Sequence, residues 1–366
     1  MPAFDPNVLL DVPPFPAEGY AGLADRLAAL LKTRNDVVFV QGEAIVALEA
    51  AATSIATPNV RALNFVTSSY GRLFGQWLRR GSAEAMDIVA EPGMPIGVET
   101  FAAALEARPA TNLVALVHAE SATGILNPLP EIARLTRARG ALLVVDAVAS
   151  VGGHHLDVDE LGIDVAAIGP QKSLAGPSGI SALSVSGRAW ETIMRPDAPT
   201  ASILSLADIK RSWFDAGRGV PPGIPSALEF HALEAALDRV EAEGIEAVIA
   251  RHALAARAAR NGLRALGLSL WVEDHNASNL VTAVRLPSGL SADAILHHPA
   301  SRAAELDRAA GNVPAELVRI NHTGQRARQQ IVVESVKAFG EALLDRGKVA
   351  DIDAAVAAVN ATYQEA

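Results

Sequence analysis

Short apolar segments that alternate with helical segments are the feature that most limits how this chain can fold. From residue 36 onward, the apolar runs have the length of buried strands, and the stretches between them show helical spacing. Such an alternation is typical of a mainly parallel sheet covered by helices on both faces. Strands are expected at residues 36–40, 61–66, 86–90, 112–118, 141–145, 164–168 and 180–185, and helices at 43–53, 70–79, 98–107 and 130–139.

After residue 225 the helices become longer and richer in alanine. Helices are expected at 226–243, 244–266, 326–344 and 351–363, and strands at 268–272, 280–286 and 316–320. This order predicts a smaller α+β domain behind the α/β domain. We therefore divide the chain into an N-terminal segment (1–19), a large α/β domain (20–235) and a small C-terminal domain (236–366).

The composition excludes several classes of protein. Of the 366 residues, 50% are hydrophobic and 20% are charged, which provides a large core and excludes a disordered chain. The formal net charge of −10 argues against binding to a nucleic-acid backbone, which requires a basic surface. The chain has no cysteine, so disulfides, thiolate metal sites and a cysteine nucleophile are all excluded.

Location and metal binding follow from local features. The first 19 residues contain several prolines together with Asp5 and Asp11, where a secretory signal would need an apolar stretch. The apolar runs are shorter than the roughly 20 residues of a membrane span. We expect a cytoplasmic protein with no membrane partner. The pairs at 154–155 and 297–298 are histidines without acidic partners at ligand spacing, and no metal site is predicted.

Two polar residues at predicted strand ends indicate the chemistry. Asp146 ends the strand at 141–145, and Lys172 lies in a Gly- and Pro-rich turn after the strand at 164–168. Ligands of open α/β sheets bind beyond the carboxyl ends of strands. Taken singly, Asp146 could cap a helix and Lys172 could point into solvent. Together, an aspartate that keeps a pyridine nitrogen protonated and a lysine that forms a Schiff base are the parts of pyridoxal chemistry.

These two segments and residues 118–128, His-Ala-Glu-Ser-Ala-Thr-Gly-Ile-Leu-Asn-Pro, resemble those of the class V aminotransferases. This family consists of fold-type I enzymes that use pyridoxal 5′-phosphate, including alanine–glyoxylate and serine–pyruvate aminotransferases. The similarity runs in order over about residues 36–345. It implies that the large domain binds the cofactor.

The resemblance also assigns roles to residues around the cofactor ring. Lys172 would form the Schiff base and carry the proton between the substrate Cα and the cofactor. Asp146 would pair with the pyridine nitrogen, and Ser121 would donate to the phenolic oxygen of the ring. Val148 would pack on one face of the ring and Tyr70 on the other.

Two further residues and an assembly are implied by the same resemblance. Gln171 would flank the site near the phosphate, and Arg319 would hold the substrate carboxylate with its planar fork of donors. By itself, Arg319 could instead form a surface salt bridge. The loop at 217–223 would reach the site of a neighbouring subunit, so a homodimer, or a dimer of dimers, is expected.

The phosphate site departs from the family pattern. Ordinary members bind the phosphate with small residues at a helix N-terminus, where free N–H groups favour an anion. Here Gly42, Glu43 and Ala44 occupy that place, with Glu43 expected in the first helical turn, where its carboxylate would compete with a phosphate. Ile224 replaces a threonine that members offer to the phosphate across the dimer. The alternative is that Glu43 turns outward and leaves room for phosphate.

The same Gly-Glu feature resembles one branch of the family, the pyridoxamine–pyruvate aminotransferases, in which the glutamate meets the ring's hydroxymethyl group. Glu43 would then contact the substrate, and unphosphorylated pyridoxamine would bind where others hold pyridoxal 5′-phosphate. That branch has a second arginine where this chain has Ala310.

The sequence therefore predicts an aminotransferase that moves an amino group from a small-molecule donor to a 2-oxo acid. The main hypothesis is pyridoxamine plus pyruvate giving pyridoxal plus alanine. Two alternatives stay open. One is an ordinary pyridoxal-phosphate enzyme of the alanine–glyoxylate or serine–pyruvate type, and the other is a lyase or a protein that only binds vitamin B6.

Overall fold

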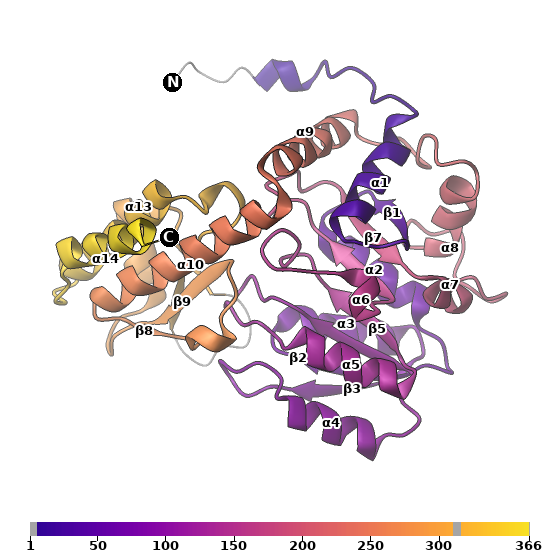
Figure 1. Cartoon of the computed structure of the whole chain (residues 1–366), viewed down its shortest axis with the longest axis horizontal. Helices are drawn as coiled ribbons and strands as arrows, with labels where there is room; N and C mark the ends of the chain where they lie inside the picture. The colour runs from indigo at the N-terminus through magenta and orange to yellow at the C-terminus, as the bar shows by residue number, and fades with distance from the viewer. Residues whose placement is uncertain (1–5, 310–315, 366) are drawn as a thin grey trace.

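A computed structural model describes residues 6–309 and 316–365 of the chain. Its main feature is a seven-stranded sheet of order β1-β7-β6-β5-β4-β2-β3 (Figure 1). Only β7 runs antiparallel to its neighbours, so the predicted mainly parallel α/β sheet is confirmed. The strands are β1 (Asp36–Val40), β2 (Arg61–Val66), β3 (Glu84–Val89), β4 (Leu113–Val117), β5 (Leu142–Asp146), β6 (Val165–Ile168) and β7 (Ser181–Val185).

Helices cover both faces of this sheet. Because crossovers between parallel strands are right-handed, α2 and α3 lie on one face and α4, α5 and α6 on the other. Within each set the neighbouring helices contact one another. The helices of this part are α1 (Gly19–Leu30), α2 (Ala44–Ile55), α3 (Ser69–Arg80), α4 (Val98–Ala107), α5 (Leu129–Arg139), α6 (Val158–Leu161), α7 (Gly187–Ile193), α8 (Leu206–Ile209) and α9 (Ala227–Glu243).

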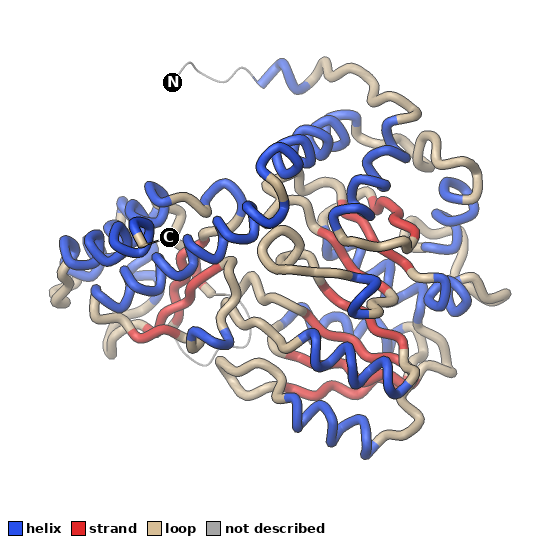
Figure 2. The backbone as a smooth tube through the Cα atoms, in the orientation of Figure 1, coloured by secondary structure: helices blue, strands red, loops and turns tan. Residues whose placement is uncertain are grey.

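The rest of the chain forms a second layered unit, with an antiparallel sheet of order β10-β11-β9-β8 against helices (Figure 2). The helices α10, α13 and α14 contact one another, and their buried faces form an apolar core apart from that of the large sheet. The strands are β8 (Ser269–Leu270), β9 (Val281–Arg285), β10 (Asp307–Arg308) and β11 (Leu317–Asn321), and the helices α10 (Ile245–Ala265), α11 (Ala292–Leu296), α12 (Pro299–Ala303), α13 (Gln329–Asp345) and α14 (Ile352–Gln364).

The predicted and observed elements differ mainly at short segments. The strand expected at 268–272 is only two residues long, since Trp271 and Val272 join a separate small apolar cluster. The sequence prediction missed α1, α6, α7, α8, α11, α12 and β10. Most of these are shorter than the window over which periodicity is measured. The domain boundaries stay a prediction, although Phe15 of the N-terminal segment packs in the large core.

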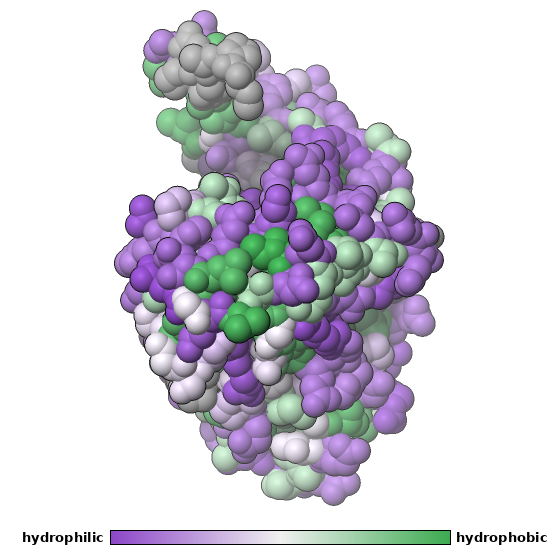
Figure 3. Space-filling model, turned by 90° about the vertical axis from the view of Figure 1, so that its left-hand side faces the viewer, coloured by the Kyte–Doolittle hydropathy of each residue, from purple (hydrophilic) through white to green (hydrophobic). Residues whose placement is uncertain are grey.

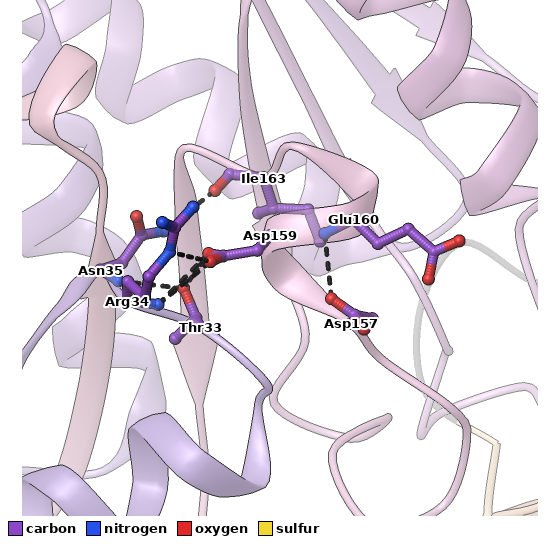
Figure 4. Close-up of polar contacts among 7 residues, drawn as sticks. All are labelled: Thr33, Arg34, Asn35, Asp157, Asp159, Glu160 and Ile163. Atoms are coloured by element: carbon purple, nitrogen blue, oxygen red, sulfur yellow. Dashed lines mark hydrogen bonds and ion pairs between the residues drawn. The ribbon is translucent and has the colours of Figure 1, made fainter.

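A hydrogen-bonded cluster ties the chain before β1 to α6 (Figure 4). Asp159 of α6 accepts a bond from the Thr33 hydroxyl at 2.6 Å, and the Arg34 Nε donates to the same carboxylate at 3.1 Å. These bonds hold the pKa of Asp159 below its usual range, and the bond from Thr33 has the largest effect. Asn35 Nδ2 donates to the Ile163 carbonyl at 3.3 Å. The cluster therefore links the start of β1 to the segment before β6, across the intervening β7.

The surface of the small unit is mixed in character. Seen from that side, a small hydrophobic patch lies among hydrophilic residues (Figure 3). The large apolar side chains exposed near the end of α13 are Leu344 and Val349. Among residues 6–309 and 316–365, no helix combines the length and the apolar character needed to cross a membrane.

Two helical glycines provide a matched test of the packing. A Cβ at Gly262 in α10 would lie 2.7 Å from a Val359 methyl of α14, whereas a Cβ at Gly22 in α1 would meet nothing within 4 Å. Gly22→Ala should raise the free energy of unfolding by about 0.5–1 kcal/mol through helix propensity. Gly262→Ala should lower it by about 1–2 kcal/mol, because overpacking outweighs propensity. Urea denaturation measures both, and equal stabilisation by the two variants would contradict the close α10–α14 contact.

Candidate active site

The site residues predicted from the sequence meet at one edge of the large sheet. Since β2, β4, β5 and β6 are parallel, the chain leaves all four strands at their common carboxyl edge. Tyr70, Ser121 and Lys172 follow β2, β4 and β6, and Asp146 is the last residue of β5. Glu43 directly precedes α2, at the end of the connection from β1.

Two cavities adjoin at this edge. One is lined by Glu43, Ala44, Ile45, Leu48, Tyr70, Val117, Ala119, Glu120, Ser121, Asp146, Val148, Ala149 and Lys172. The other is lined mainly by the β6–β7 loop and the small unit, and it includes Ser121, Gln171, Lys172 and Arg319. Lys172 and Ser121 line both, so the lysine stands where the cavities meet. Gly42 is absent from both linings, and its carbonyl accepts a bond from the Ser181 hydroxyl at 2.9 Å.

The carboxylate of Glu43 occupies the N-terminus of α2. Glu43 is the N-cap residue, one position before the first turn where it was expected, and its Oε2 accepts a bond from the Ile45 N–H at 2.8 Å. Gln171 Nε2 donates to its Oε1 at 2.5 Å. A helix N-terminus offers few free N–H groups to an anion. Here one of these donors is already bound to a side-chain carboxylate.

Lys172 lies on a turn that contacts the small unit. The pKa of its amine is lowered by burial, while the nearby charge of Glu43 acts in the opposite direction. Its carbonyl oxygen faces Gly324, where an added Cβ would come within 2.9 Å. Gly324 has a φ of +61°, which favours glycine. Partial burial thus increases the fraction of neutral amine at Lys172 Nζ.

Asp146 lies half-buried, with its exposed part facing the first cavity. Burial raises the pKa of its carboxyl to about 6, against the effects of a bond from the Val148 N–H and the charge of Lys172. That bond is 3.0 Å long. A carboxylate in this position gains from a cation placed beside it, which would lower its pKa.

Tyr70 and Val148 are walls of the same cavity. Tyr70 lies in the first turn of α3, whose N-cap Ser68 accepts a bond from the Tyr70 N–H at 3.2 Å. Burial and then the charge of Glu43 raise the pKa of its phenol. An aromatic ring and a branched aliphatic side chain provide apolar surface for a flat ligand.

Arg319 projects from β11 of the small unit toward the second cavity. Its Nη1 donates to the Ser121 carbonyl, and its Nη2 donates to Asp307 Oδ2 at 2.5 Å. The guanidinium is therefore both a cavity residue and a member of a salt bridge, the two possibilities that the sequence left open. Ala310, which stands where the pyridoxamine–pyruvate branch has a second arginine, lies outside the described residues.

Comparisons with known proteins agree with this geometry. The family model "Aminotransferase class-V" matches residues 17–302. A pyridoxamine–pyruvate transaminase of Mesorhizobium japonicum is 36% identical over 97% of this chain and 92% of its own length.

The chain belongs to the class V aminotransferases. Among solved structures, the pyridoxamine–pyruvate aminotransferase of Mesorhizobium loti superposes with a TM-score of 0.88 at 34% identity, covering 99% of this chain and 90% of its own. The ureidoglycine–glyoxylate aminotransferase of Bacillus subtilis gives a TM-score of 0.88 at 25% identity, over 98% and 95% of the two chains. The predicted family, fold-type I architecture and enzyme class are confirmed.

Class V aminotransferases depend on pyridoxal phosphate, and the first cavity fits the ring of that cofactor better than its phosphate. Asp146 suits a protonated ring nitrogen, and apolar walls suit the ring faces. At the N-terminus of α2, however, the Glu43 carboxylate already accepts the hydrogen bond from the Ile45 N–H. A dianion there would meet a fixed negative charge.

The buried carboxyl of Glu120 also lines the first cavity, and no role was predicted for it from the sequence. Its Oε1 accepts a bond from the Thr67 hydroxyl at 2.5 Å, and Thr67 in turn accepts one from Asn127 Nδ2 at 3.0 Å. Burial raises the pKa of Glu120 to about 7, although the bonds from Thr67 and Ser68 act to lower it. Glu120 therefore anchors the β2–α3 loop that leads to Tyr70.

We expect the free energy of unfolding to change with pH because of the raised pKa of Glu120. Its pKa rises from an ordinary 4.5 to about 7 on folding, so the stabilisation is complete below pH 4.5 and is lost as the pH rises through 7. Glu120→Gln stays neutral and avoids this loss. From pH 5 to pH 8 the variant should gain on the order of 2 kcal/mol of unfolding free energy over the wild type.

Urea denaturation at the two pH values measures this gain. Glu106→Gln, at an exposed position of α4, is the matched control and should show no such trend. A constant difference between Glu120→Gln and the wild type across this range would contradict the raised pKa.

Proposed function

We propose that this aminotransferase uses unphosphorylated pyridoxamine as amino donor and pyruvate as acceptor, giving pyridoxal and alanine. The observation that carries the proposal is the Glu43 carboxylate at the N-terminus of α2, bound by the Ile45 N–H and by Gln171. The matched transaminase of Mesorhizobium japonicum bears the name of this reaction and supports the choice of substrates.

Glu43 would recognise the hydroxymethyl group of the vitamer. A carboxylate accepts hydrogen bonds, so it pairs with a hydroxyl and repels a phosphate. Gln171 keeps the carboxylate in place from the other side. In this proposal Gln171 positions the Glu43 carboxylate. The family resemblance instead implied that Gln171 lies near the cofactor phosphate.

The other residues of the first cavity would bind the vitamer and transfer a proton. The pyridine ring of the bound vitamer supplies an electron sink for bond breaking at the amino carbon. Asp146 would hold its ring nitrogen in the protonated form, and Ser121, Val148 and Tyr70 would position the ring. Lys172 Nζ, whose pKa is lowered by burial, would act as nucleophile and would take and return the proton.

Arg319 would hold the pyruvate carboxylate in the second cavity, within reach of the lysine that lines both cavities. A guanidinium gives a carboxylate two parallel N–H bonds and so fixes its direction as well as its place. Such a fixed carboxylate presents the keto carbon of the acid toward Lys172.

A homodimer and a cytoplasmic location belong to the same proposal. Ile203 and Ile224 are 87% and 96% exposed, beside a cavity lined by Gly223, Pro222 and other residues. Exposed large apolar side chains at such a surface favour contact with a second copy of the chain. A dimer of dimers stays a prediction.

An ordinary pyridoxal-phosphate aminotransferase is the second candidate. The similarity to the ureidoglycine–glyoxylate aminotransferase favours it, as does the dependence of the family on pyridoxal phosphate. In that case Glu43 would have to turn away from the helix end to admit the phosphate.

Lys172→Ala tests the chemistry common to both candidates. Transamination should fall by more than about 10⁴-fold, since nucleophile and base are lost together. Alanine formation from pyridoxamine and pyruvate gives the rate, and borohydride reduction followed by mass spectrometry detects covalently held vitamer. Lys337→Ala, at an exposed position of α13, is the control and should keep full activity. Vitamer still trapped on Lys172→Ala would assign the role to another lysine.

Variants of Glu43 separate the two candidates. The wild type should bind pyridoxal more tightly than pyridoxal 5′-phosphate. Glu43→Ser removes the charge and frees the Ile45 N–H, so preference should shift toward the phosphate by at least about tenfold. Ile224 should keep this rescue incomplete. Absorbance titration of both vitamers measures the shift.

Glu43→Gln is the matched control for side-chain volume, because it removes the charge but can still accept the Ile45 bond. It should shift the preference less than Glu43→Ser does. A wild type that already prefers pyridoxal 5′-phosphate would overturn the pyridoxamine–pyruvate proposal and leave the ordinary aminotransferase.

A further inference from the structure

Asp307 already holds the arginine that the proposed function assigns to the substrate carboxylate. Asp307 lies on β10 directly opposite Arg319 on β11. Its Oδ2 accepts a bond from Arg319 Nη2 at 2.5 Å, while Nη1 donates to the Ser121 carbonyl. The Nε of Arg319 is buried and has no hydrogen-bond partner among the described residues.

An arriving carboxylate therefore meets a guanidinium that is partly occupied. Bidentate binding needs two neighbouring N–H donors, either Nη1 with Nη2 or Nε with Nη2. Both arrangements use Nη2, the nitrogen that holds Asp307. Nη2 carries two hydrogens and Asp307 accepts one of them, so a substrate carboxylate that binds Nη2 lies beside the Asp307 carboxylate and competes with it for the same positive charge.

Exposure decides which partner can move. The Asp307 side chain is 58% exposed and that of Arg319 only 19%. Asp307 can turn into water, where its charge is solvated, whereas Arg319 is held by Ser121. Exchange is thus possible, and its cost is that of a largely exposed ion pair, about two- to fivefold in affinity.

We propose that Asp307 is a specificity-determining residue that competes with the substrate carboxylate for Arg319. This inference rests on the proposed function, in which Arg319 binds the 2-oxo acid. Asp307 lowers the affinity for the acid, because a carboxylate at Arg319 either lies beside the internal carboxylate or displaces it. It also leaves a negative charge next to the bound acid, which disfavours substrates with a further anionic group nearby.

The neighbouring acidic residues do not share this position. Asp293 and Glu316 both pair with Arg308, at 2.7 and 3.1 Å. Arg308 adjoins Asp307 on β10, and successive side chains of a strand point to opposite faces. Asp293 thus carries the same charge on the same small unit but forms its ion pair with Arg308. It is therefore the matched control.

The experiment measures pyruvate with the full-length protein. The dissociation constant comes from calorimetry, and KM and kcat come from turnover at saturating pyridoxamine. Asp307→Asn should lower both the dissociation constant and KM about two- to fivefold and change kcat less than twofold. Asp307→Ser, a second way to remove the charge, should do the same. Asp307→Glu and Asp293→Asn should stay near the wild type.

Two outcomes overturn the proposal and differ from a failure of the proposed function. A higher KM in Asp307→Asn would make Asp307 a residue that orients Arg319, and an unchanged KM would make the pair irrelevant to binding. Arg319→Lys is the reference, since loss of the fork should weaken pyruvate binding. If Arg319→Lys binds pyruvate as the wild type does, the assignment of Arg319 fails, and the role of Asp307 fails with it.

Discussion

The parallel pairing of β2, β4, β5 and β6 is the constraint on which the site depends. It brings four chain segments to one edge of the sheet, and each delivers at least one polar or aromatic group there. The strands themselves are apolar and buried, so their ends cannot shift without exposing the core. The rigid sheet therefore fixes the relative positions of the lysine, the aspartate and the apolar wall that line one cavity.

Burial then sets the charge states around that edge. Three carboxyl groups, of Glu43, Glu120 and Asp146, share a cavity with the single amine of Lys172. Burial raises the pKa of Glu120 to about 7 and that of Asp146 to about 6, and it lowers the pKa of Lys172. Removal from water disfavours every charged form, so the cavity gains most from a ligand that brings its own positive charge. A protonated pyridine ring is such a ligand, and a phosphate is not.

Most of the large sheet could be predicted because its strands are continuous apolar runs, and Asp146 and Lys172 could be found because they interrupt that pattern. The short helices could not, since four or five residues carry too little periodicity. By contrast, α1 buries Tyr20, Leu23, Ala24 and Leu27 at helical spacing, so its signal was present. The N-cap position of Glu43 lay one residue from the prediction. The burial of Glu120 and the pairing of Asp307 with Arg319 depend on loop packing and strand register, which local sequence does not encode.

The contact between Gly324 and Lys172 ties the backbone of the lysine to the small unit. Gly324 is held from α10 on two sides, since its N–H donates to His252 Nε2 at 2.8 Å and its carbonyl accepts from Arg251 Nη1 at 2.8 Å. Its α-carbon leaves no room for a side chain against the Lys172 carbonyl. Because Gly324 joins α10 to the turn of Lys172 in this way, the backbone position of the lysine depends on how the small unit packs. A side chain at position 324 would therefore disturb the segment that carries Lys172.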